Sequence, residues 1–451
     1  MKNEMITNAV TKLLNLYFDF TDKTIKLNDQ YVSRINGNTN IKLKDNFFDK
    51  YNDSMEFYNK FDLFAEVENY INQHLDELLN ENSENIILKL IEVIELKLKD
   101  ILLNTVNINH ITKKEKLNLT DLKKNINNFT LKNILFKGVP GTGKSYKIDK
   151  IITKKLNLTK DSKNILRVNI HSASSNADLM QGIAISTEDK QVTYKEKQGL
   201  IFKHIQKACF SPYEPFVLVL EEIQENSLNE LIGDLIYLIE DDKRAKITKE
   251  LKSDIFIDKQ EYSYIDLVDL YIEHIPNTHS VEIPNLVSID EKNRKMIMPD
   301  NLYIFCTSNY RDDKKVIEDN LLRRFDVIEV YPQYIETIGE EFKSEEVSDF
   351  LKELNSKILE TFTNEIHPDR FLIGHSNWLN IEDMHTQKFY KALLKVVVEF
   401  KEIRELDFKE GIEKVFKDMK FPDDDKINLT NYKTLVESLQ KVVYKEILEL
   451  K

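Results

Sequence analysis

The sequence has 451 residues, of which 41% are hydrophobic and 31% are charged, and its formal net charge is −13. At this length roughly two to four globular domains are expected, and the hydrophobic content excludes a mostly disordered chain. With only 10 Gly and 9 Pro, collagen-like and low-complexity architectures are excluded as well. The acidic balance offers no general electrostatic attraction to nucleic acid.

Cysteine usage and hydropathy indicate the cellular compartment that we expect for the chain. Cys209 and Cys306 lie far apart in apolar runs, and no Cys/His cluster has metal-ligand spacing, so neither a disulfide framework nor a zinc site is expected. No apolar run reaches the roughly 18 residues of a membrane span, and the N-terminal residues do not resemble a signal peptide. We therefore expect no membrane segment and a cytoplasmic location.

The first region, residues 1–127, is expected to form a mainly helical domain for recognition or partner binding. Its strongest pattern runs from Ile86 to Leu103, where apolar residues recur every three or four positions. Aromatic residues are dense in this region, and core packing is favoured over base stacking for them. They are Phe47, Phe48, Tyr51, Phe57, Tyr58, Phe61 and Phe64.

From Leu131 the pattern changes to short apolar strands that alternate with helical segments, which predicts a parallel α/β sheet. This second domain is expected at residues 128–332, with an insert at 241–298, and a helical lid with C-terminal helices follows at 333–451. Five strands are expected, at Ile134–Phe136, Ile165–Ile170, Phe216–Leu220, Leu302–Thr307 and Val327–Tyr331.

A phosphate-binding loop follows the first of these strands. The run from Gly138 to Ser145 matches G-x-x-x-x-G-K-[ST] between a strand and a helical pattern. Backbone N–H groups of such a loop cradle phosphates, the lysine reaches the β- and γ-phosphates, and the serine holds Mg²⁺. The expected nucleotide-binding residues are Gly138, Val139, Pro140, Gly141, Thr142, Gly143, Lys144, Ser145 and Tyr146.

Further chemistry-bearing residues follow three later segments. Glu221 and Glu222 end an apolar strand, where the first acid can join Ser145 in holding the metal and the second can orient the attacking water. Asn309 ends another strand and can hold that water near the γ-phosphate. The pair Arg323 and Arg324 precedes the fifth strand and can act as fingers on the nucleotide of a neighbouring subunit. Glu222, Asn309, Arg323 and Arg324 are the candidate catalytic residues.

This order of motifs resembles the AAA+ ATPases, and finer detail resembles the McrB-type NTPases of modification-dependent restriction systems. The resemblance covers about Leu131 to Phe400. It rests on Asn176–Gly182 (family EDFIQG), Gln198–Phe202 (DGIFY), Pro212–Phe216 (the approach to the acidic strand end), Gly233–Leu235 (GEL), Ile239–Arg244 (MEPDKR) and Phe371–Ser376 (IGHS).

The sequence also departs from the family pattern. Glu221 stands where the family has Asp, and Glu225 stands where it has Arg. The segment that corresponds to the family's MNTADRS reads Thr307–Asp313 with altered spacing, and this segment is linked to the preference for GTP. GTP and ATP therefore both remain open as the substrate.

The resemblance implies a homo-oligomeric ring, with six subunits as the favoured number, and a separate McrC-like nuclease subunit encoded beside it. DNA is then contacted through residues 1–127 or through that partner. Two other interpretations stay open. One is a MoxR-like AAA+ ATPase that remodels a protein partner, which the acidic balance favours. The other is a degenerate ring subunit that binds nucleotide without turnover, because Glu221 replaces Asp.

Overall fold

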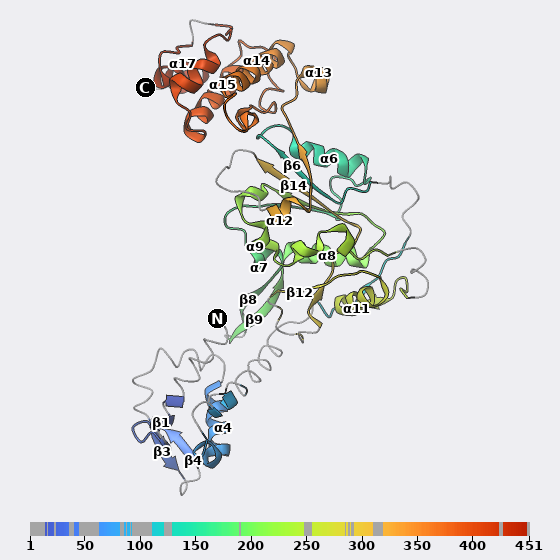
Figure 1. Ribbon diagram of the computed structural model, residues 1–451, viewed down its shortest axis with the longest axis vertical. Coiled ribbons are helices and arrows are strands. Elements are labelled where there is room, and N and C mark those ends of the chain that lie inside the picture. Colours follow the sequence, from blue (N-terminus) through green and yellow to red (C-terminus); the bar gives the residue numbers. More distant parts are fainter. Residues whose placement is uncertain are drawn as a thin grey trace. The chain divides into compact units, whose positions relative to one another are not determined.

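The computed structural model of the chain is shown in Figure 1. It describes residues 14–15, 17–21, 24–35, 40–44, 63–81, 85–86, 88–90, 92, 111–120, 129–188, 191–247, 255–284, 286, 289, 293–309, 319–423 and 427–448. The chain forms two compact units, and each is built from several segments. The first unit combines Met1–Lys113, Gln181–Lys197 and Ile283–Arg294, and the second combines Lys114–Met180, Gln198–Glu282 and Lys295–Lys451.

The first unit contains strands as well as helices. Strand β1 (Phe18–Thr21) pairs with β2 (Thr24–Leu27), and β3 (Val32–Ile35) pairs with β4 (Asn40–Leu43), both antiparallel. Helix α4 follows at Leu63–Leu78. The expectation of a mainly helical region did not include these hairpins, because strands of four residues are too short for alternation to stand out.

Only part of the helix expected from Ile86 to Leu103 lies within the described residues. Residues 85–86, 88–90 and 92 are helical, and Ile86 and Leu90, one turn apart, are both fully buried. This agrees with the apolar face that the periodicity predicts. The rest of that helix and the aromatic residues from Phe47 to Phe61 lie outside the described residues. The unit also includes most of a strand pair that the sequence pattern did not predict, β8 (Gln181–Glu188) with β9 (Gln191–Gln198).

The second unit contains the predicted parallel sheet of five strands. Its strands are β6 (Asn133–Gly138), β7 (Ile165–Asn169), β10 (Phe216–Glu221), β14 (Leu302–Asn309) and β15 (Asp326–Glu329). Their order in the sheet is β15-β6-β14-β10-β7, and all pairs are parallel. The predicted strands are therefore confirmed, and the fold is the α/β fold of an AAA+ domain.

The strand order brings three predicted motifs to one edge of the sheet. Strand β14 lies between β6 and β10, so Asn309 ends between the phosphate-binding loop and the two acids. In the β6–β14 register Asn309 lies directly opposite Gly138. Because parallel strands share their carboxyl edge, ligands of open α/β sheets bind there. Helix α6 (Lys144–Lys154) starts from this edge, and its Ile148 and Ile152 pack on the sheet core.

Short elements complete the α/β region. The helices are α7 (Asn176–Leu179), α8 (Leu200–Phe210), α9 (Leu228–Ile232), α10 (Leu235–Leu238) and α12 (Asp319–Leu322). Within the expected insert, residues 241–298, lie β11 (Glu261–Tyr262), α11 (Tyr264–His274), β12 (Val281–Glu282) and β13 (Lys295–Met296). Strand β11 pairs with β5 (Glu115–Lys116), and β12 pairs with β13.

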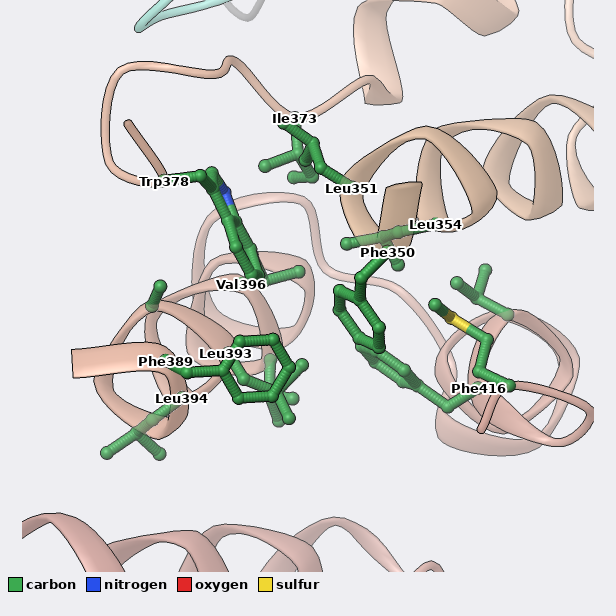
Figure 2. Packing of buried hydrophobic residues seen from close by; sticks show 14 of the residues in the cluster. Phe350, Leu351, Leu354, Ile373, Trp378, Phe389, Leu393, Leu394, Val396 and Phe416 are labelled. Carbon is green, nitrogen blue, oxygen red and sulfur yellow. The ribbon is translucent and has the colours of Figure 1, made fainter. Parts of the chain in front are cut away.

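The region after the sheet is mainly helical, as predicted. Its helices are α13 (Ile335–Ile338), α14 (Glu345–Thr361), α15 (Gln387–Val398), α16 (Glu413–Phe416), α17 (Tyr432–Val443) and α18 (Lys445–Leu448). They share an aromatic core in which Phe350, Trp378 and Phe389 meet, with the rings of Phe350 and Phe389 4.9 Å apart (Figure 2). This region has its own hydrophobic core. The domain boundaries at 127 and 332 stay predictions.

Among the described helices, none combines the length and apolar composition that crossing a membrane requires. Cys209 and Cys306 are both buried, and neither is in a disulfide. Burial raises the pKa of both thiols well above the ordinary range. Both cysteines are therefore protonated core residues at neutral pH.

Candidate nucleotide site

The phosphate-binding loop has the geometry that its glycines permit. Gly141 and Gly143 have φ angles of +75° and +80°, which glycine adopts without steric cost. At Gly138 an added Cβ atom would lie 2.2 Å from the backbone oxygen of Val330, so only glycine fits against the end of β15. The glycine pattern is thus a structural requirement of the loop between β6 and α6.

Lys144 is turned into this loop and is only 7% exposed. Its Nζ donates to the carbonyl oxygens of Gly138 and Val139, each at 3.0 Å, and to Oδ1 of Asn309 at 2.7 Å. All three are neutral acceptors. A phosphate oxygen is a stronger acceptor for an ammonium group, because both partners are then charged. The side chain is therefore poised at the site where a γ-phosphate is expected.

Ser145 and Glu221, the two residues expected to hold the metal, are in direct contact. The Ser145 hydroxyl donates to Oε2 of Glu221 at 3.1 Å, and the Thr307 hydroxyl donates to the same oxygen at 2.6 Å. Mg²⁺ prefers oxygen ligands and is commonly held by one or two side chains together with phosphates and water. No larger group of acids and histidines suited to a metal occurs among the described residues. One hydroxyl and one carboxylate fit a magnesium ion that arrives with a nucleotide.

Glu222 is held in a strained conformation beside this pair. Its φ of 58° is left-handed, which is uncommon for a residue other than glycine. Its backbone N–H donates to the Thr307 hydroxyl at 3.1 Å. Its Oε2 accepts from Nε2 of Gln224 at 2.5 Å and from Nδ2 of Asn309. Asn309 thus joins Glu222 to Lys144, and the predicted polar residues of the carboxyl edge form one network.

The structure separates the two predicted arginines. Arg324 forms an ion pair with Glu240 at 3.0 Å, and its guanidinium also donates to the backbone oxygen of Asn320. Arg323 is exposed. Both precede β15, whose first residue, Asp326, pairs with Ile134 near the start of β6. Roughly 13 Å of strand therefore separates this register from Gly138, at about 3.3 Å per residue. Neither arginine lies beside the phosphate-binding loop of its own chain.

One segment of the helical lid, residues 374–376, packs directly against the phosphate-binding loop. Ser376 N donates to the Gly141 oxygen at 3.0 Å, and a Cβ atom on Gly374 would lie 2.1 Å from the Pro140 oxygen. The intervening His375 accepts at Nδ1 from the backbone N–H of Gln333 at 3.0 Å. Burial lowers the pKa of His375, so the neutral ring with its proton on Nε2 is favoured.

The remaining predicted loop residues have supporting positions. Val139 is buried in the core of the lid helices, and Pro140 contacts Gly374 as described. The buried Thr142 hydroxyl donates to the Val139 oxygen at 2.9 Å. Tyr146 is half-exposed, and its hydroxyl donates to Oε1 of Glu341 at 3.0 Å. These four residues shape the loop and join it to the lid.

Three residues of the network were not predicted. Thr307 lies two positions before Asn309, so strand alternation places both side chains on one face of β14 and could have identified it. Gln224 lies two positions after Glu222, and its side-chain amide donates to the Glu222 carboxylate. Arg167, in β7, contacts Oε1 of Glu221. Its signal in the sequence is a charged residue between the apolar residues Leu166 and Val168 of a predicted strand.

Parts of this sequence are similar to known proteins. Residues 133–325 match the family model of the AAA domain of the dynein-related subfamily. Over 255 residues the chain is 24% identical to the type IV methyl-directed restriction enzyme EcoKMcrB subunit of Escherichia coli K12, a match that covers 54% of this chain and 47% of that protein. The chain therefore spans about half the length of this curated relative.

A structural comparison adds one loose similarity. The structure of C. elegans PCH-2 aligns over 70% of this chain and 62% of that chain, with 13% identity and a TM-score of 0.23. A superposition of this quality supports no argument about function.

Proposed function

We propose that this chain hydrolyses GTP or ATP as the motor subunit of a McrBC-like restriction complex. The premise is the AAA domain at residues 133–325 together with the similarity to the EcoKMcrB subunit. The observation that carries the proposal is the polar network of the carboxyl edge. Lys144, Asn309 and Glu222 are joined there by direct hydrogen bonds, and the Ser145–Glu221 pair lies beside them.

Nucleotide binding begins with Lys144. Its ammonium leaves the carbonyl oxygens of Gly138 and Val139 for the β- and γ-phosphate oxygens, which carry the negative charge that the carbonyls lack. The backbone N–H groups of the loop and the first turn of α6 bind the same phosphates. Ser145 and Glu221 would hold Mg²⁺, which would neutralise negative charge on the phosphates.

Hydrolysis requires an oriented water molecule. Glu222 accepts the water proton, and Asn309 holds the water against the γ-phosphate. When Lys144 moves to the phosphates, Oδ1 of Asn309 loses its bond to Nζ and becomes available to the water. The network therefore couples phosphate binding to the placement of the attacking group.

A second positive charge at the γ-phosphate, besides Lys144, comes from a neighbouring copy of the chain. Arg323 lies at the opposite edge of the sheet and is exposed, so it fits a role as a finger on the nucleotide of the next protomer. Arg324 is bonded to Glu240 and supports the turn that presents Arg323. A ring of copies, with six as the favoured number, supplies each nucleotide with such an arginine.

Restriction activity requires a second protein. The similarity to the EcoKMcrB subunit supports a separate McrC-like nuclease subunit and a DNA target, contacted through residues 1–127 or through that partner. The second candidate is a MoxR-like ATPase that remodels a protein partner. The net charge of −13 favours that candidate, since such a chain has no general attraction to DNA.

Steady-state hydrolysis of the four NTPs tests the proposal, with and without DNA and the product of the neighbouring reading frame. We expect the protein to hydrolyse GTP or ATP, and we expect DNA and a nuclease encoded by the neighbouring reading frame to change the rate of hydrolysis. A Lys144→Ala variant should bind no nucleotide, whereas Lys154→Ala, an exposed lysine in the last turn of α6, should behave as the wild type. Nucleotide binding without hydrolysis under every condition would instead identify a degenerate ring subunit.

A further inference from the structure

We propose that Arg167 is a positioning residue that orients the Glu221 carboxylate for magnesium. The inference rests on the proposed nucleotide site and adds a residue that neither the motifs nor the family resemblance assign. Arg167 lies in β7, the edge strand next to β10, and its guanidinium contacts Oε1 of Glu221. Its second partner is Asp149 of α6.

The two oxygens of Glu221 have different partners. Oε2 accepts from Ser145 at 3.1 Å and from Thr307 at 2.6 Å, so it faces the hydroxyl side where the metal is expected. Oε1 is bound to Arg167 on the other side. The carboxylate is therefore held from both sides, and only one of its oxygens is presented to a cation beside Ser145.

The guanidinium fork is itself fixed. Its Nη2 lies 2.5 Å from Oδ1 of Asp149, while its Nη1 contacts Glu221. Asp149 follows Ser145 by four residues in α6, so both side chains project from one side of the helix. Arg167 thus ties the acidic end of β10 to the same face of α6 that supplies the metal-binding hydroxyl. A lysine has a single ammonium and cannot reproduce this planar, two-pronged contact.

The length of Glu221 explains the need for such a contact. Glutamate has one more rotatable bond than the aspartate that McrB-type proteins have here, so its carboxylate can reach the metal from several rotamers. Fixing a long side chain in one rotamer lowers its conformational entropy. Because the Arg167 guanidinium already holds Oε1, this entropy is lost before the metal binds and does not weaken metal binding. Partners that orient a metal ligand commonly change metal affinity by about 10–100-fold when they are removed.

The test measures the Mg²⁺ concentration that half-saturates binding of a fluorescent, non-hydrolysable nucleotide analogue. We expect Arg167→Met and Arg167→Lys each to raise that concentration by about 10–100-fold. Nucleotide binding without Mg²⁺ should stay as in the wild type. Arg34→Met, an exposed arginine of β3, is the matched control and should have no effect. A wild-type response of Arg167→Lys would overturn the proposal, because charge alone would then suffice, and so would a lowered requirement in Arg167→Met.

A second pair of variants separates positioning from a general loss of structure. In a Glu221→Asp background the shorter carboxylate no longer depends on the fork, so Arg167→Met should change the Mg²⁺ requirement by less than about twofold, against about 10–100-fold in the wild-type background. Equal effects in both backgrounds would overturn the positioning role. If wild-type protein binds no nucleotide at any Mg²⁺ concentration, the proposed function fails, which is a distinct outcome.

Discussion

Charged residues lie at both the carboxyl ends and the amino ends of the sheet strands, but they have different kinds of partners at the two ends. At the carboxyl edge, Lys144, Ser145, Glu221, Glu222 and Asn309 bond mainly to each other and to loop carbonyls, and a nucleotide can replace these partners. At the amino edge, charged side chains form ion pairs and hydrogen bonds that join separate segments of the chain. The first edge is arranged for a ligand, and the second is arranged for stability.

Arg244 shows the difference most clearly. It is 2% exposed and donates to the oxygens of Ile239 at 3.0 Å, Leu302 at 2.5 Å and Asn133 Oδ1 at 2.6 Å. Burial lowers its pKa to about 10. The segment Ile239–Arg244, which resembles a family motif, is therefore structural, since its Glu240 also anchors Arg324. What distinguishes Arg323 from these arginines is its exposure.

The largest effect is expected at the carboxyl edge. Glu222→Gln should keep nucleotide affinity and lower turnover by about 10²–10⁴-fold, because an amide cannot accept the water proton. Nucleotide binding by fluorescence and steady-state hydrolysis measure the two properties separately.

Glu221→Gln is the matched control, since the same substitution one residue earlier should act on the Mg²⁺ requirement of nucleotide binding. If Glu221→Gln instead shows normal Mg²⁺ dependence with lost turnover, and Glu222→Gln is benign, the roles of the two acids are reversed.

A smaller effect is expected near the amino end of β10. Burial lowers the pKa of His204 from 6.5 to about 4, and its Nε2 lies 3.1 Å from the Val217 oxygen. The unfolded chain takes up a proton as the pH falls below about 6.5, whereas the folded chain does not until about pH 4. Between pH 7 and pH 4 this single group therefore removes about 3 kcal/mol of stability.

His204→Gln keeps a donor for the Val217 oxygen but does not titrate. Urea unfolding followed by circular dichroism measures the free energy of unfolding at pH 7 and at pH 4. The decrease between the two pH values should be about 3 kcal/mol smaller in the variant than in the wild type. An unchanged difference between the two pH values would mean that His204 is protonated in the folded protein.

The smallest effect distinguishes the two neighbouring arginines. Arg324→Ala removes one of the two ion-pair partners of the partly buried Glu240, which keeps Lys243, and should lower the free energy of unfolding by about 1 kcal/mol. Arg323→Ala should leave stability unchanged, because that side chain is exposed. Thermal unfolding of the two variants measures the difference, and equal losses would show that Arg323 also has a structural partner.

Local patterns were sufficient to predict the sheet, and they also place the candidate site residues at its carboxyl edge. Each of the five predicted strands is rich in apolar residues, and the phosphate-binding loop has the glycine, lysine and serine spacing of a strand–loop–helix unit. The carboxyl edge could be predicted because parallel strands necessarily end together. The same reasoning predicts that Asn309, Glu221 and Lys144 lie close together, and the structure shows Asn309 bonded to Lys144.

Other features depend on contacts that no local pattern encodes. Arg167 acts through Asp149 and Glu221, which lie 18 residues before and 54 residues after it in the sequence. The distinction between Arg323 and Arg324 depends on Glu240, which precedes them by more than 80 residues. The four-residue strands β1 to β4 pair with each other, and their alternation is too short to distinguish them from helical segments.

The central claim is that each nucleotide site is completed by an arginine from a neighbouring copy. Mixing Lys144→Ala protein with Arg323→Ala protein tests it most directly, because each variant alone should lack turnover. In an equal mixture up to about a quarter of the interfaces combine an intact loop with an intact arginine, so hydrolysis should return to that fraction of the wild-type rate and rise with protein concentration. No recovery on mixing, with wild-type hydrolysis independent of protein concentration, would contradict the claim.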